Sequence, residues 1–224
     1  MISQSACGQQ RITTKNYQVR EFSSIQSDIV GNIIITQSNN RVVRAEGNED
    51  LVNALTVEVR NDELKLSIKS SAKRKFKNRK NKLTVWVSTP QLNRVRNNGV
   101  GNISINGKID TDKLLIESEG VGNFKAENLY VGEVKVNSNG VGNVTLSGSA
   151  QFADLNIDGV GNLDAKELKT VDAIVHSDGV GSVKCYASKE IEIHASGIGS
   201  VTYYGNPQIK SLNKEGIGSL KSGD

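Results

Sequence analysis

The chain has 224 residues, a formal net charge of +4, only 4% aromatic residues and two cysteines, Cys7 and Cys185. No run of 18 apolar residues occurs, so the sequence predicts no membrane-spanning helix, and two cysteines are too few for a disulfide framework. Seven of the 28 basic residues lie in residues 73–82, and the remainder of the chain is slightly acidic. This distribution excludes a broad basic surface for nucleic acid.

Residues 1–20 are predicted to form a polar N-terminal tether. The stretch "SACGQQ" is typical of the mature start of a bacterial lipoprotein, in which the cysteine carries the lipid. We therefore expect Cys7 to be lipidated in the native precursor and to provide the only contact with a membrane. No apolar signal segment precedes it, so the alternative is an incidental cysteine in a polar tail.

Residues 21–98 are predicted to form an irregular β-rich half that covers one end of a larger domain spanning residues 21–224. "LTVEVRNDELKLSIK" predicts a hairpin that turns at residues 61–63, and "GNIIIT" at residues 31–36 predicts the first coil. The basic stretch is predicted to be a loop that binds an anionic polysaccharide or a phosphate headgroup, or else a solvated loop without a ligand. Its candidate binding residues are Lys73, Arg74, Lys75, Lys77, Arg79, Lys80 and Lys82.

Residues 99–224 contain one motif seven times, at intervals of 18 to 21 residues, and each unit alternates apolar and polar residues. A fixed period of this length with strand-like alternation predicts a solenoid of parallel strands. We expect an all-β, single-stranded, right-handed parallel β-helix with one unit per rung. The motif residues are Gly99, Gly101, Asn102, Gly120, Gly122, Asn123, Gly140, Gly142, Asn143, Gly159, Gly161, Asn162, Gly179, Gly181, Gly197, Gly199, Gly216 and Gly218.

The motif is interpreted as an architectural corner. Glycine tolerates positive φ and lets neighbouring rungs approach closely, and stacked asparagines can hydrogen-bond along their column. Apolar residues four before and four and six after the first motif glycine are predicted to form the core, with Cys185 as a reduced core cysteine. We expect the column after the first glycine (Val100, Val121, Val141, Val160, Val180, Ile198 and Ile217) to point inward. The alternative is outward, as an apolar interaction stripe.

The order of these segments resembles a known bacterial family, "Putative auto-transporter adhesin, head GIN domain". The resemblance covers about residues 20–224 and includes the repeated "GVGN" corners. It implies a right-handed β-helix in a cell-envelope protein of the Bacteroidetes type, with an adhesive role and no established catalytic residues. Family members often carry aspartate where this chain has Asn102, Asn123, Asn143, Asn162 and later serines, which weakens the case for a metal at the corners.

Two pairs of side chains are candidates for chemistry. His176 and His194 are predicted to lie roughly 5 Å apart on adjacent rungs, as a weak metal site or a solvated pair. Asp158 and Asp178 are predicted to stack about 5 Å apart, as a glycosidase-like carboxylate pair or an ordinary surface ladder. Together with neighbouring polar residues they form a strip suited to an extended glycan.

These observations predict a non-catalytic cell-envelope or surface protein without a cofactor or a metal. We expect it to be an adhesin or a binding scaffold for polysaccharide, or for an envelope or host protein. One alternative is a carbohydrate-active enzyme that uses the acidic ladder. The other is a structural protein that associates with further copies of itself.

Overall fold

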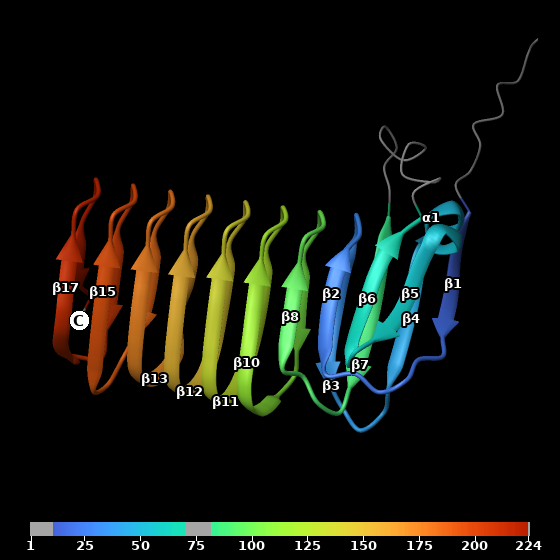
Figure 1. Ribbon diagram of the computed structural model, residues 1–224, viewed down its shortest axis with the longest axis horizontal. Coiled ribbons are helices and arrows are strands. Elements are labelled where there is room, and N and C mark those ends of the chain that lie inside the picture. Colours follow the sequence, from blue (N-terminus) through green and yellow to red (C-terminus); the bar gives the residue numbers. More distant parts are fainter. Residues whose placement is uncertain (1–10, 70–81, 224) are drawn as a thin grey trace, which may run out of the picture.

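The computed structural model describes residues 11–69 and 82–223. Strands make up 68% of the chain and stack into a β-solenoid of about six turns, so the predicted parallel β-helix is confirmed. In Figure 1 the rungs follow one another along the long axis, and the less regular N-terminal elements occupy one end. Of the described residues, only Glu49–Ala54 form an α-helix, and no helix is long and apolar enough to cross a membrane.

The regular rungs are built from long or paired strands that match their successors in parallel register. Leu114, Val134, Ala153, Ala173 and Ile191 mark one such column. The strands are β8 (Arg94–Asn97), β9 (Ile103–Asn106), β10 (Ile109–Ser118), β11 (Phe124–Ser138), β12 (Val144–Ile157), β13 (Leu163–Ser177), β14 (Val183–Tyr186), β15 (Glu190–Ala195), β16 (Val201–Tyr204), β17 (Gln208–Lys214) and β18 (Leu220–Ser222).

The predicted core columns are buried along almost the whole solenoid. Ile103, Phe124 and Val144 are each at most 2% exposed, and the column continues through the later rungs to Val201. The last rung differs, because Leu212 is 46% exposed and no described strand follows β18. Burial of one aliphatic residue per rung in each column provides the main driving force for stacking.

The N-terminal half folds back on itself before the regular rungs begin. Its elements are β1 (Ile12–Tyr17), β2 (Ser24–Asp28), β3 (Asn32–Gln37), β4 (Val42–Asn48), α1 (Glu49–Ala54), β5 (Leu55–Arg60), β6 (Glu63–Ile68) and β7 (Leu83–Thr89). The predicted hairpin is present as β5 and β6, and Asn61 and Asp62 adopt positive φ in its two-residue turn. The first coil, β2 and β3, lies between β6 and β7 on one side and β8 and β9 on the other.

Residues 12–17 form β1, so the tether predicted for residues 1–20 does not extend over them. β1 pairs with β4 in antiparallel register, and the Tyr17 hydroxyl donates a hydrogen bond to the Val52 carbonyl of α1 at 3.1 Å. The short helix α1, which no sequence pattern indicated, buries Leu51 and Val52. This end of the solenoid is therefore covered by an edge strand and a helix, which protects the terminal rung from solvent.

Each corner is shaped by close approach between successive rungs. A Cβ added to Gly159 would lie 2.1 Å from the Gly140 carbonyl oxygen, and one added to Gly161 would lie 1.9 Å from that of Gly142. Gly161 also has a φ of 148°, which L side chains rarely adopt. Both motif glycines are thus required by packing, and the second also by its backbone conformation.

The asparagine after the second glycine bonds the corner to the next rung. The Asn162 amide donates to the Asn143 side-chain oxygen at 2.9 Å, and the Asn143 amide donates to Asn123 at 3.0 Å. The same bond runs from Asn32 through Asn102 to Asn123, and from Asn162 to the amide of Ser182. The predicted ladder is therefore present, but its main donors are backbone amides, which these side chains satisfy at the turn.

Candidate functional site

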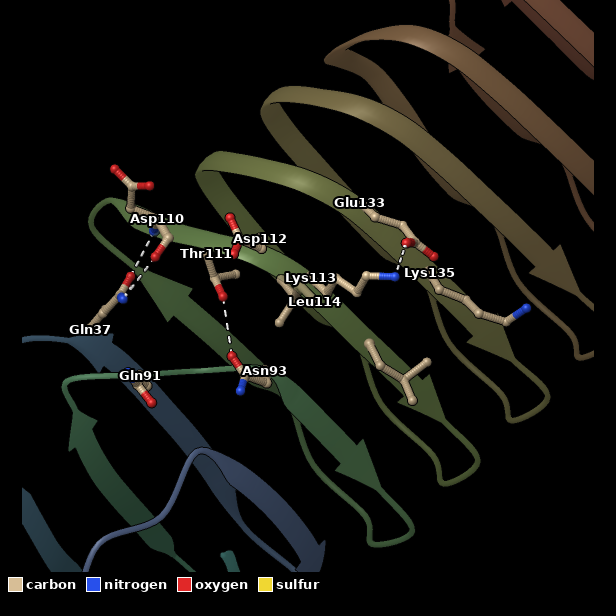
Figure 2. A pocket seen from close by; sticks show the side chains of 11 residues that line it. Gln37, Gln91, Asn93, Asp110, Thr111, Asp112, Lys113, Leu114, Glu133 and Lys135 are labelled. Carbon is tan, nitrogen blue, oxygen red and sulfur yellow. Dashed lines mark hydrogen bonds and ion pairs between the residues drawn. The ribbon is translucent and has the colours of Figure 1, made fainter.

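A cleft of about 700 Å³ lies where the N-terminal half meets the regular rungs (Figure 2). Gln37 reaches it from the end of β3, Gln91 and Asn93 from the connection between β7 and β8, and the remaining side chains from β10 and β11. Most of these side chains are polar, and they include Asp112, Lys113 and Glu133. We call this feature the polar cleft.

Hydrogen bonds between distant segments hold one wall of the polar cleft in place. The Gln37 side-chain amide donates to the carbonyls of Pro90 at 2.9 Å and Asp110 at 3.0 Å, and its oxygen accepts from the Asp110 amide at 2.7 Å. The Thr111 hydroxyl donates to the Asn93 side-chain oxygen at 3.1 Å. A ligand would therefore meet a cleft wall whose shape is already fixed, which lowers the entropy lost on binding.

The rim of the polar cleft carries charges and an exposed aromatic ring. Lys113 Nζ lies 2.7 Å from Glu133 Oε2, and this hydrogen bond raises the pKa of Lys113 above its ordinary value. Tyr130 is the register partner of Asp110 on the next rung and is 49% exposed, with Lys108 Nζ 4.9 Å from its ring centroid. The rim thus offers an ammonium, carboxylates and a partly open aromatic face.

A second surface feature runs along the corners. The column after the first motif glycine points outward, so the expected inward orientation is wrong. Its seven members are bridged to Val30 of the first coil, and the eight residues, which we call the aliphatic stripe, are 47–75% exposed and joined by parallel bridges: Val30, Val100, Val121, Val141, Val160, Val180, Ile198 and Ile217. The reason is that strand alternation continues through the corner. The position of Gly99 faces inward, where the neighbouring rung leaves no space for a side chain.

His176 and His194 lie where the repeat placed them. Their rings stack with centroids 5.1 Å apart and an interplanar angle of 8°, and their register partners on the outer rungs are Asn156 and Asn213. In the described part of the chain, no group of three or more histidine, cysteine, aspartate or glutamate side chains is placed to hold a metal. The structure therefore provides a stacked imidazole pair without a third ligand of these types.

Asp158 and Asp178 are exposed and occupy equivalent positions on consecutive rungs, next to the bridged Val160 and Val180. Asp178 accepts a hydrogen bond from the Ser196 hydroxyl on the following rung. Neither aspartate lines the polar cleft. A glycosidase needs its two carboxylates on either side of an enclosed scissile bond, and the geometry here is that of an open ladder.

Glu117 lies in the same register column as Asn137, Asn156 and His176, yet it is buried, with 8% of its surface exposed. Arg94 Nε donates to it at 2.6 Å, and Arg96 donates through Nη2 at 2.9 Å and Nε at 3.2 Å. Burial raises the pKa of the Glu117 carboxyl, but the hydrogen bonds and charges of the two arginines outweigh burial and hold this pKa below its ordinary value. Glu117 therefore links β8 to β10 and is not part of an open binding strip.

Cys185 is a free, buried thiol on β14, and burial raises its pKa to about 12. It is unsuited to nucleophilic chemistry at neutral pH. The candidate lipidation residue Cys7 and the basic candidates Lys73, Arg74, Lys75, Lys77, Arg79 and Lys80 lie outside the described residues. The polar cleft was missed because its walls come from segments far apart in the sequence, from Gln37 at the end of β3 to Lys135 on β11, which no local pattern connects.

The fold places this protein in the class of β-solenoids. Its surface carries the aliphatic stripe along the corners and the polar cleft beside the capped end. The family model described as "Putative auto-transporter adhesin, head GIN domain" matches residues 21–207, and the chain belongs to this family. No match is found among curated proteins.

Solved structures agree with this assignment. A putative adhesin from Bacteroides fragilis is 38% identical, with a TM-score of 0.90, and the match covers 96% of this chain and 98% of that one. A putative adhesin from Parabacteroides merdae is 19% identical, with a TM-score of 0.65 and coverage of 96% and 97%. A putative lipid binding protein from Parabacteroides distasonis is 18% identical, with a TM-score of 0.68 and coverage of 93% and 96%. The last two show the shared fold alone.

Proposed function

We propose that this protein is a non-catalytic adhesin of the bacterial cell envelope that binds polysaccharide in the polar cleft. The observation that carries the proposal is the cleft lining, in which amide, hydroxyl, carboxylate and ammonium groups face one hollow of about 700 Å³. Polysaccharides present closely spaced hydroxyls that both donate and accept hydrogen bonds, so they match such a lining. The family description supports an adhesive role, and a surface or envelope location follows from that role.

The ligand chemistry follows from how the cleft side chains are held. Gln37 uses both of its side-chain N–H donors on the Pro90 and Asp110 carbonyls, so its role is to hold the cleft wall. The Asn93 oxygen is held by the Thr111 hydroxyl, and the exposed Asp112 and Lys113 face solvent. The Asn93 amide group suits the recognition of neutral sugar hydroxyls, and charged groups strengthen hydrogen bonds to them. The half-exposed Tyr130 ring beside the rim provides an apolar face for the C–H side of a sugar ring.

Screening against an array of bacterial and host polysaccharides, followed by calorimetry on the retained glycan, tests the proposal. The double variant Asp112→Asn with Lys113→Gln removes two charged partners from an exposed site, and we expect it to weaken affinity at least about tenfold. The matched control is Asp158→Asn, an exposed aspartate outside the cleft, which should bind like the wild type. Unchanged affinity in the cleft variant would rule out the cleft as the binding site.

Lipid anchoring at Cys7 and glycan binding by the basic residues 73–80 remain proposals that rest on the sequence. Expression of the native precursor with an alkyne-labelled fatty acid should label the wild type and leave Cys7→Ser unlabelled. Label on both proteins would exclude this cysteine as the anchor. Replacing Lys73, Arg74 and Lys75 by glutamine in the array experiment tests whether the basic stretch, and not the polar cleft, retains the glycan.

A further inference from the structure

The aliphatic stripe is an unusual surface for a single chain in water. Eight β-branched side chains, each about half exposed or more, lie on consecutive rungs with no interruption. Those from Val100 onward are flanked in sequence by glycine on both sides, so no adjacent side chain covers them. Their exposed area amounts to roughly 500–600 Å², at the upper end of the largest apolar patches on typical monomers.

The spacing of the stripe restricts what can cover it. Parallel bridges set its side chains about 4.8 Å apart, the distance between hydrogen-bonded strands. One face of an extended peptide repeats about every 6.6 Å, and a helix has a pitch of about 5.4 Å, so neither stays matched over eight rungs. The stripe of a second copy has the same spacing and therefore stays matched over all eight rungs, because each rung then meets the same rung of its partner.

The charges beside the stripe favour this occupant over a lipid surface and also set its orientation. One flank, the column two residues before each stripe residue, carries five carboxylates among its eight residues: Asp28, Glu119, Asp158, Asp178 and Glu215. The other flank is the neutral column of asparagines and serines. Five carboxylates would be repelled by anionic lipid headgroups, which disfavours membrane insertion of the stripe.

We propose that two copies of this chain associate through the aliphatic stripe, side by side and parallel, about a two-fold axis that runs along the solenoid. In this arrangement the acidic flank of each copy faces the neutral amide flank of the other, where Asn123, Asn143 and Asn162 can donate hydrogen bonds. An antiparallel pair would instead place acidic flank against acidic flank, which is unfavourable. Covering both stripes buries roughly 1,000–1,200 Å², close to the lower limit for specific interfaces.

Sedimentation velocity at concentrations up to about 100 μM, which covers the micromolar range of weak complexes, tests the association. We expect the wild type to be a dimer and the double variant Val141→Lys with Val160→Lys to have half its mass. The matched control is Gln151→Lys, which should remain dimeric. Gln151 is exposed and lies within β12, away from the corners that carry Val141 and Val160. Thermal unfolding of all three proteins shows that the variants are folded.

Disulfide cross-linking in a Cys7→Ser background tests the orientation. In a parallel pair Val100→Cys meets itself and forms a covalent dimer, whereas in an antiparallel pair it cross-links only with Ile198→Cys on the other copy. A monomeric wild type, a dimer that is unaffected by the two lysines, or cross-linking only between Val100→Cys and Ile198→Cys would each overturn the proposal. So would a monomer that floats with lipid vesicles and loses this property on lysine substitution.

Discussion

At the scale of single residues, the corners depend on contacts that a side chain would destroy. We expect Gly161→Ala to lower the free energy of unfolding by more than about 3 kcal/mol, because its Cβ would overlap the Gly142 carbonyl oxygen. Gly107→Ala is the matched control: Gly107 also has positive φ, at 83°, but a Cβ there meets nothing within 4 Å. It should lower stability by only about 1–2 kcal/mol in urea unfolding. Equal losses would show that conformation, not packing, sets the requirement.

The corner asparagines contribute through the backbone amides that they satisfy. Asn143→Ala removes the acceptor for the Asn162 amide, and we expect it to lower the free energy of unfolding by about 0.5–1.5 kcal/mol. Asn139→Ala on the same rung, at an exposed position of the acidic flank, provides the control and should change stability little. Chemical unfolding measures both, and similar losses at the two positions would contradict the role of the ladder.

At the scale of elements, the Glu117 cluster makes the junction of β8 and β10 sensitive to acid. The folded pKa of Glu117 lies below its ordinary, unfolded value, so its contribution to stability is present above the unfolded pKa and is lost as the pH falls through the folded pKa. We expect Glu117→Gln to lower the free energy of unfolding by about 1–3 kcal/mol at pH 7.

The difference between Glu117→Gln and the wild type should shrink as the pH falls below the ordinary carboxyl pKa of about 4.3, because Glu117 is then increasingly protonated and becomes uncharged, as the glutamine already is. Urea unfolding across this pH range measures it. The control is Glu119→Gln, an exposed carboxyl two residues further along. A gap that stays constant down to strongly acidic pH would show that charge on Glu117 does not stabilise the junction.

The sequence predicts the strands of the regular rungs, whose neighbours share one register, better than the strands of the capped end. Ile103, Phe124 and Val144 recur at a fixed position in each unit, so the repeat alone places them in the core. The capped end has no such repeat: β7 returns to pair with β3 and β4, and this follows from long-range packing that local alternation does not encode. The expected inward orientation of the aliphatic stripe was wrong because strand alternation continues through each glycine corner. Whether it continues depends on backbone geometry that the sequence does not show.

At the scale of the whole molecule, the solenoid separates structural from functional surfaces. Its core and corners repeat, and the polar cleft forms only where that repeat meets the folded-back N-terminal half, between Gln37 and β10. The site was therefore not predictable from the repeat, whereas the stacked His176 and His194 were. The aliphatic stripe extends along the regular part and gives the molecule a second surface, independent of the cleft.

The central claim is that this family member binds polysaccharide without cleaving it. The most direct test is to incubate the wild type with its retained polysaccharide and to measure bound glycan and released oligosaccharide in the same sample. We predict retention with no release, and the same result for the double variant Asp158→Asn with Asp178→Asn. Released products that disappear in this variant would contradict the account and identify the acidic ladder as a catalytic pair.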